Sequence, residues 1–510
     1  MTNLDIVDDD VMSVILSFVE PDVLQPSLYL VARSLKALAS VSWRFRRLCL
    51  PWLYRDVAWF WKDVDGHFQF IPESLWIYVR KFRLTGSSRR YPHIPRRRDV
   101  FLDSEHLASR VLAEQLAVAI PRMTGLREFC FDLEATYWPG PWQSLLESIA
   151  LSRTLESLEI NGQWRCQWEA LLPLSMNQVP IRRFRYLPYL STLSRLDHQV
   201  AVQGMRDVEE RQVEAHNLRL LLSSFCETLN ILEIPAELAN DLSLSFPSLT
   251  ELTMCGHSPL PVLSSSLWSE IVPEATLRVL DFGVVRSSGA HMSSGQVSLL
   301  ARNLSHLHTL ILSNALPNDA IFRALPSELS HLSLNPYPLP YPRPEARIPV
   351  KIMPGAALVR ILTIGKFANL KTLSISYRWD SNESDISLIN SLHDICPQLV
   401  HLEFSRYGTQ PGGDPLDVLI LLQTSLRRSV HLRTLRLNLE NAPASLSLFE
   451  SLHANDRSAK RHSLLRDIAI GSTRLHSISY LLLDFPFKCS FDWVWVTWDV
   501  RDNDSVRLNF

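Results

Sequence analysis

One spacing of apolar residues, apolar-x-x-apolar-x-apolar, recurs along most of this chain and restricts the folds that it can adopt. The clear copies are LREFCF from Leu126, LESLEI from Leu155, LNILEI from Leu229, LTELTM from Leu249, LRVLDF from Leu277, LHTLIL from Leu307, LSHLSL from Leu329, LKTLSI from Leu370, LVHLEF from Leu399 and LRTLRL from Leu432. Weaker copies are VRKFRL from Val79, IRRFRY from Ile181 and LRDIAI from Leu465. Many of these starts lie 20 to 33 residues apart. Self-similarity at this period predicts a solenoid of stacked units.

Each copy has the period of a short β-strand, and helical patterns follow some of the copies. In LKTLSI, Leu373 and Ile375 alternate with Ser374, so the aliphatic side chains face one side of the strand and the polar ones the other. The segment DPLDVLILLQTSLRRS from Asp414 has helical apolar spacing, and its Pro415 suits a first helical turn. One unit cannot bury its apolar side alone, but stacked neighbours cover each other.

These units resemble irregular leucine-rich repeats over about residues 79 to 470. The resemblance implies an α/β fold, a curved solenoid of parallel strands with helices on its outer face. We expect this solenoid to occupy residues 61–510, with inserted loops at about 87–100 and 335–355 and a C-terminal capping region at about 475–510. A chain of 510 residues is longer than one hydrophobic core usually organises, which agrees with an elongated array.

Residues 1–60 precede the solenoid and carry helical patterns instead. Val11, Ile15 and Phe18 lie at i, i+4 and i+7 behind three acidic residues that suit a helix N-terminus. A second helical face follows before Pro51 interrupts it, and it comprises Leu35, Leu38, Val41, Phe45 and Leu48. These residues predict a small helical module at the start of the chain.

This module resembles an F-box. The resemblance rests on the pair Ile15 and Leu16, on SVSWRFRRL from Ser40 and on PWLYR from Pro51. It implies the substrate-recognition subunit of a Skp-cullin-F-box ubiquitin ligase, in which the F-box binds the Skp adaptor, and through it the cullin, while the solenoid binds a protein substrate of unknown identity. Such a chain is not an enzyme. We expect the Skp-binding residues to be Val11, Ile15, Leu16, Val41, Trp43, Leu48 and Trp52.

The polar positions of the strands are the candidate substrate-binding residues. If the aliphatic residues face inward, the intervening side chains form a ladder on the sheet's other, concave face. The charged or ionisable members of this ladder are Glu128, Asp132, Glu159, Glu251, Asp281, His401, Glu403 and Arg436. Acids are more frequent toward the N-terminal half, which favours a basic segment on the substrate.

Composition and missing motifs exclude several classes of function. The formal net charge of −2 argues against nucleic acid or an anionic membrane as the main partner. The sequence has no H-E-x-x-H, no G-x-x-x-x-G-K-[ST], no G-x-S-x-G and no paired-cysteine zinc pattern, so we expect no catalytic residues, no cofactor and no metal. The scattered cysteines and the lack of a leader or an apolar span predict reduced thiols in the cytoplasm or nucleus.

Two alternatives remain open at this point. A leucine-rich-repeat scaffold unconnected to ubiquitin ligation shares every feature after Val79, and only the N-terminal module argues against it. A regulator of small GTPases could also use a solenoid and a single arginine. Recovery of a Skp subunit with the purified chain is the observation that separates the ligase subunit from both.

Overall fold

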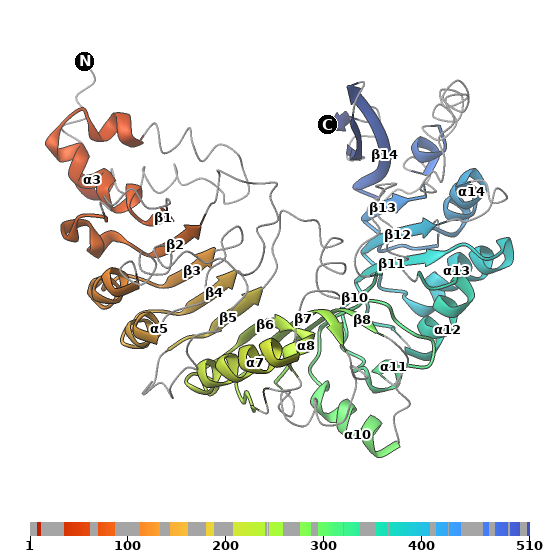
Figure 1. Cartoon of the computed structure of the whole chain (residues 1–510). Coiled ribbons are helices and arrows are strands. Elements are labelled where there is room, and N and C mark those ends of the chain that lie inside the picture. The colour runs from red at the N-terminus through yellow and green to blue at the C-terminus, as the bar shows by residue number, and fades with distance from the viewer. Residues whose placement is uncertain are drawn as a thin grey trace. The chain divides into compact units, whose positions relative to one another are not determined.

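The computed structural model describes residues 8–11, 35–61, 70–86, 113–132, 143–161, 180–187, 208–239, 242, 244–258, 276–286, 294–319, 321–336, 352–365, 367–407, 415–426, 428–439, 463–468, 475–487, 490–499 and 507–509. The chain divides into two compact units (Figure 1). The first comprises Met1–Leu190 with Asp207–Glu233, and the second comprises Ser191–Arg206 with Ile234–Phe510. The predicted inserted loops at about 87–100 and 335–355 lie wholly or largely outside the described residues.

Parallel strands in chain order build the first unit, and each strand pairs with the next. They are β1 (Asp56–Trp61), β2 (Lys81–Gly86), β3 (Glu128–Asp132), β4 (Ser157–Asn161), β5 (Arg183–Leu187) and β6 (Ile231–Pro235). The last two residues of β6 belong to the second unit. The labelled helices are α3 (Trp43–Leu53), α5 (Gln143–Ala150) and α7 (Val208–Ser223), with the 3₁₀ turns η2 (Glu73–Tyr78) and η3 (Ile120–Arg122). Residues 9–11, 35–39 and 113–119 are also helical.

The second unit repeats this order of strand and helix. Its strands are β7 (Glu251–Ser258), β8 (Val279–Arg286), β9 (Thr309–Leu312), β10 (His331–Leu334), β11 (Thr372–Arg378), β12 (His401–Tyr407), β13 (Thr434–Asn438), β14 (Ser477–Phe487), β15 (Ser490–Asp499) and β16 (Arg507–Asn509). The pairing is parallel from β7 to β14, and antiparallel for β14 with β15 and β15 with β16. Its helices are α8 (Ala236–Ala239), α10 (Ser294–Asn303), α11 (Ile321–Ala324), α12 (Gly355–Gly365), α13 (Asn382–Ile395) and α14 (Pro415–Leu426). The prediction of an α/β protein with parallel strands is confirmed.

At the start of most strands, two backbone N–H groups donate to one carbonyl oxygen, which belongs to the residue just before the previous strand. The carbonyl oxygen of Arg80 accepts from the N–H groups of Arg127 at 2.8 Å and Glu128 at 3.0 Å. Lys371 does the same for Val400 at 2.8 Å and His401 at 2.9 Å. Each strand therefore begins at the level of the one before it, and corresponding residues of successive repeats lie side by side.

The aligned repeats bury their apolar positions in continuous rows. In the first unit Phe82, Phe129, Leu158 and Phe184 form one such row, and the rings of Phe82 and Phe129 stack with centroids 5.5 Å apart. The corresponding row of the second unit is Leu252, Leu280, Leu310, Leu332, Leu373, Leu402, Leu435 and Ile478. At about 25 cal/mol per Å² of buried apolar surface, these rows are the main source of stability.

The weak copy LRDIAI from Leu465 is not a strand, and this prediction was wrong. Residues 463–468 are helical, with Leu465 and Ile468 buried on one side. An i, i+3 pair of apolar residues also suits a helix, which explains the error. The strand that follows β13 instead comes from LHSISY, where Leu475 and Ile478 are buried and β14 begins at Ser477.

The second helical pattern of the N-terminal module forms two helices, where we expected one helical face that ends at Pro51. Residues 35–39 are helical, but the hydroxyl of Ser42 accepts from the N–H of Phe45 at 3.2 Å and caps a separate helix, α3. Pro51 does not interrupt this helix, which continues to Leu53. Val41 therefore lies in the turn between the two helices and is exposed.

A buried polar cluster joins β11, β12 and α13. Tyr377 and Arg406 are paired positions on the two strands, and both face the core. The Tyr377 hydroxyl donates to Asp385 Oδ1 at 2.6 Å, and Arg406 Nε lies 3.0 Å from Asp385 Oδ2. The Arg406 guanidinium also lies over the ring of Trp379, 5.5 Å from its centroid. In the first unit Tyr186 of β5 similarly donates to the buried carboxylate of Glu214 in α7.

Asp385→Ala should strongly destabilise the second unit, because it leaves the charge of Arg406 buried without a carboxylate. We expect a loss of about 3–5 kcal/mol in the free energy of unfolding. Glu403→Ala is the matched control: its ion pair with Arg436 is half-exposed at 3.8 Å, and pairs of that kind contribute less than about 1 kcal/mol. Urea unfolding followed by circular dichroism measures both changes. Equal losses would contradict the assigned role of the buried pair.

The same cluster predicts a loss of stability at alkaline pH. Burial, followed by the nearby Asp385 carboxylate, raises the pKa of Tyr377 well above its usual value of 10.0. Above pH 10 the unfolded chain thus loses a proton that the folded chain retains, so the free energy of unfolding falls as pH rises. Tyr377→Phe lacks this titration. The stability advantage of the natural chain over the variant at pH 8 should shrink at pH 11, and a constant difference in urea midpoints would refute this.

Candidate protein-binding surfaces

The N-terminal helical module is held together by an apolar cluster and by an ion pair. Leu35 and Cys49 are buried at the centre of the cluster, and its half-buried members are Leu38, Ala39, Leu48, Trp52 and Leu53. Asp9 reaches α3 through both carboxylate oxygens, 2.7 Å from Arg44 Nε and 2.8 Å from Arg47 Nη2. These contacts, led by the hydrogen bond from Arg44, lower the pKa of Asp9.

The predicted Skp-binding residues fall into three groups. Val11, Val41 and Trp43 are exposed, with 51%, 69% and 79% of their surface accessible. Leu48 and Trp52 pack against the apolar cluster, so they also form part of the module's own core. Ile15 and Leu16 lie outside the described residues. Exposed large apolar side chains are common in binding surfaces, and Trp is among the residues most enriched there.

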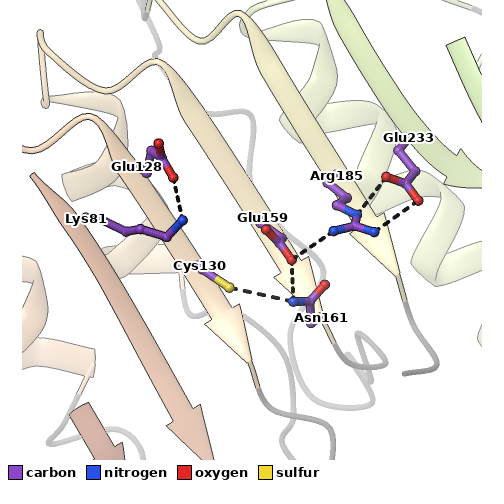
Figure 2. A network of polar contacts seen from close by, with 7 residues as sticks. All are labelled: Lys81, Glu128, Cys130, Glu159, Asn161, Arg185 and Glu233. Carbon is purple, nitrogen blue, oxygen red and sulfur yellow. Dashed lines mark hydrogen bonds and ion pairs between the residues drawn. The ribbon is translucent and has the colours of Figure 1, made fainter. Parts of the chain in front are cut away.

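The polar positions of β2 to β6 form a charged surface, the polar strand face of the first unit (Figure 2). Glu128 and Lys81 are register partners on adjacent strands, and Lys81 Nζ lies 2.8 Å from Glu128 Oε2. The next position along the strands holds Cys130, Glu159, Arg185 and Glu233 in one row. Acidic and basic side chains therefore lie next to each other across the strands.

Arg185 links the two acids on either side of it. Its Nε lies 2.6 Å from Glu233 Oε2 and its Nη1 lies 3.5 Å from Glu159 Oε1. The Asn161 amide donates to Glu159 Oε1 at 2.5 Å and to Cys130 Sγ at 3.6 Å. Figure 2 shows these contacts as one network running across the strands.

Burial changes the ionisation of two groups on this face. It raises the pKa of Asp132, and the opposing effect of Arg83 is smaller. Burial and, secondarily, Glu159 raise the pKa of Cys130 to about 12, so this thiol stays protonated at neutral pH. Since protonated thiols are poor nucleophiles, Cys130 is a packing residue.

The structure changes our expectation of an acidic surface. Glu128, Asp132 and Glu159 do lie on one face, as predicted, but Lys81, Arg83, Arg183 and Arg185 lie among them. These bases were not among the predicted residues, although the same alternation in the weak copies VRKFRL and IRRFRY places them on this face. This face therefore presents charges of both signs.

The other predicted substrate-binding residues lie in the second unit. Glu251 and Asp281 occupy the polar positions of β7 and β8. Glu403 and Arg436 are register partners with side-chain atoms 3.8 Å apart, and His401 Nδ1 lies 2.5 Å from Thr434 Oγ1. Because these residues belong to the second unit, they form a second candidate surface.

Small hydroxyl residues around Asn335 dominate the middle of this second face. The Asn335 side-chain nitrogen lies 2.9 Å from Ser333 Oγ and 2.9 Å from Ser374 Oγ, and its oxygen accepts from Ser376 at 2.7 Å. His331 lies on the same face, and burial, followed by His401, lowers its pKa. This part of the face is therefore uncharged at neutral pH, in contrast to the first unit.

Within the described residues, no group of three or more His, Cys, Asp and Glu side chains could hold a metal ion. Among the described residues, Cys49, Cys130, Cys226 and Cys396 are free thiols. Among the described helices, none has the length and apolar character required to cross a membrane.

Comparison with known proteins adds no assignment. No protein-family model matches the chain, and no curated protein matches its sequence. The two surfaces and the N-terminal module are therefore the features of this chain that bear on its function.

Proposed function

We propose that this chain is the substrate-recognition subunit of a Skp-cullin-F-box ubiquitin ligase. Residues 1–60 act as an F-box that binds the Skp adaptor, and the strands and helices from residue 61 act as a leucine-rich-repeat solenoid that binds the substrate. The protein performs no chemistry of its own. It raises the concentration of substrate lysines near a ubiquitin-loaded conjugating enzyme, and its place is the cytoplasm or nucleus.

The observation that carries the docking proposal is the exposure of Trp43 and Val41. Trp43 begins α3 and Val41 lies in the turn before it, while Phe45 and Cys49 on the opposite side of the helix are buried. Within the described residues, the apolar cluster of the module therefore forms without Trp43. Exposure of 79% of a tryptophan side chain to water is unfavourable at an ordinary surface position. The same side chain is a suitable anchor for an apolar pocket on a partner.

The substrate-binding proposal rests on the strand faces. The helices and the leading leucines take up the apolar side of each repeat, which leaves the polar side for recognition. The first unit offers alternating charges and the second offers hydroxyl and amide groups. Both patterns suit polypeptide partners, whose side chains and backbone can pair with each group in turn.

Replacing Val41 and Trp43 by Asp should remove Skp from the purified complex. Loss of one hot-spot aromatic costs about 2 kcal/mol or more, which is roughly 30-fold in affinity. The matched control carries Val118→Asp and Leu151→Asp, because these side chains are 57% and 69% exposed outside the module. Pull-down and calorimetric titration with recombinant Skp measure the effect.

Equal binding of Skp by the two double variants would contradict the docking proposal. If the natural chain itself recovers no Skp, the repeat-protein scaffold becomes the better explanation. Circular dichroism of both variants confirms that the comparison concerns binding and not folding.

Charge reversal on the polar strand face of the first unit should weaken substrate capture and leave Skp binding intact. Arg83→Glu with Arg183→Glu changes two exposed bases of this face. The control, Arg153→Glu with Arg219→Glu, changes two exposed bases in a turn and in α7. Proteins captured while the proteasome is inhibited are compared at low and high salt, and the loss should be larger at low salt. Equal capture by both variants would exclude this face.

A further inference from the structure

Lysine is scarce in this chain, and its positions are uneven. The lysines are Lys36, Lys62, Lys81, Lys351, Lys366, Lys371, Lys460 and Lys488, and all other members of the 51 Lys and Arg residues are arginines. Residues 82–350 contain no lysine, although they include most of the first unit and several repeats of the second.

Some arginines are required by the geometry around them. Arg185 contacts carboxylates on both sides, and Arg406 combines an ion pair with a position over the Trp379 ring. A planar guanidinium meets such demands and an ammonium group does not, so lysine cannot replace arginine there.

Other arginines have no such requirement. Arg153 lies in an exposed turn before β4, Arg219 is exposed on α7, and Arg323 is exposed on α11. At solvated positions of this kind, lysine and arginine serve folding and solubility about equally. Stability therefore does not explain why arginine is used throughout residues 82–350.

Each unit has few lysines among its described residues. Lys81 lies on the polar strand face, with its Nζ 2.8 Å from Glu128 Oε2. Lys36 is exposed in the helix of residues 35–39, and Lys371 is exposed before β11. The remaining lysines lie outside the described residues.

The chemical difference between the two cations matters for ubiquitin transfer. A lysine Nζ that has lost its proton attacks the thioester carbonyl carbon at the C-terminus of ubiquitin. A C–N bond forms, the C–S bond to the conjugating enzyme breaks, and the cysteine leaves as a thiolate that takes up a proton. A guanidinium stays protonated in proteins and cannot act as this nucleophile.

We propose that the replacement of lysine by arginine protects this subunit from ubiquitin transfer to itself, so that the bound substrate supplies the acceptor amines. The inference rests on the proposed function and concerns its regulation. A subunit that holds substrate beside a ubiquitin thioester is itself at high effective concentration there, and exposed lysines on its repeats would compete with the substrate.

The test uses the full chain assembled with Skp, cullin and RING subunits, and supplied with ubiquitin, activating enzyme and conjugating enzyme. One variant carries Arg153→Lys, Arg219→Lys and Arg323→Lys, and the control carries Arg→Gln at the same positions. The lysine variant should show a severalfold rise in ubiquitin attached to this chain, mapped by mass spectrometry to positions 153, 219 and 323. The control should match the natural chain, and all three proteins should share one unfolding midpoint.

The outcomes separate this inference from the function on which it rests. Failure of the natural chain to bind Skp overturns the proposed function and the inference with it. Normal Skp binding with no rise in self-modification of the lysine variant overturns the inference alone, and composition bias then accounts for the arginines. Rapid self-modification of the natural chain at its existing lysines also overturns it.

Discussion

The backbone carbonyl that precedes a strand is the constraint on which much of this structure depends. Where it accepts two N–H groups from the next repeat, as Arg80 does for Arg127 and Glu128, it fixes where that repeat's strand begins. Side chains reinforce the same junction in places: the hydroxyls of Thr154, Thr228 and Thr276 donate to the carbonyls of Leu126, Ile181 and Leu249, the leading apolar residues of the preceding repeats. Register is thus set at every step by local contacts, which a repeat chain needs because its units touch only their neighbours.

Because backbone contacts set the register, the side-chain positions of each repeat can have different roles. The three apolar positions form the core. The alternating positions lie on the other side of each strand, so they can carry paired charges in one unit and hydroxyl groups in the other. A binding surface can therefore change along the chain while the fold stays the same. The N-terminal module shows the same division on α3, where Cys49 is buried and Trp43 is exposed.

The repeat period predicted the strands well because buried strand positions in this fold follow one short rule. Leu373 and Ile375 are buried as the spacing requires, and Ser374 lies on the opposite side of β11. The rule failed at Leu465, where i, i+3 spacing served a helix. The separate expectation that Pro51 interrupts a helix was also wrong, because α3 tolerates proline there and continues to Leu53. Ion pairs such as Arg185 with Glu233 were missed because they depend on which strands are neighbours. Side-chain exposure at Trp43 depends on the packing of the whole module, and no local pattern contains that information.

The cluster of Tyr377, Asp385 and Arg406 also bears on the specificity of assembly. Repeats built from leucine and isoleucine are nearly interchangeable, so a helix could pack against the wrong pair of strands with little loss of apolar contact. A buried charged group does not tolerate this exchange of packing partners. If α13 packed one repeat away, Arg406 would remain buried without its carboxylate, at a cost of several kcal/mol, on the order of 3–5. The cluster thus distinguishes β11 and β12 from the other strand pairs and makes one stacking order unique among near-identical alternatives.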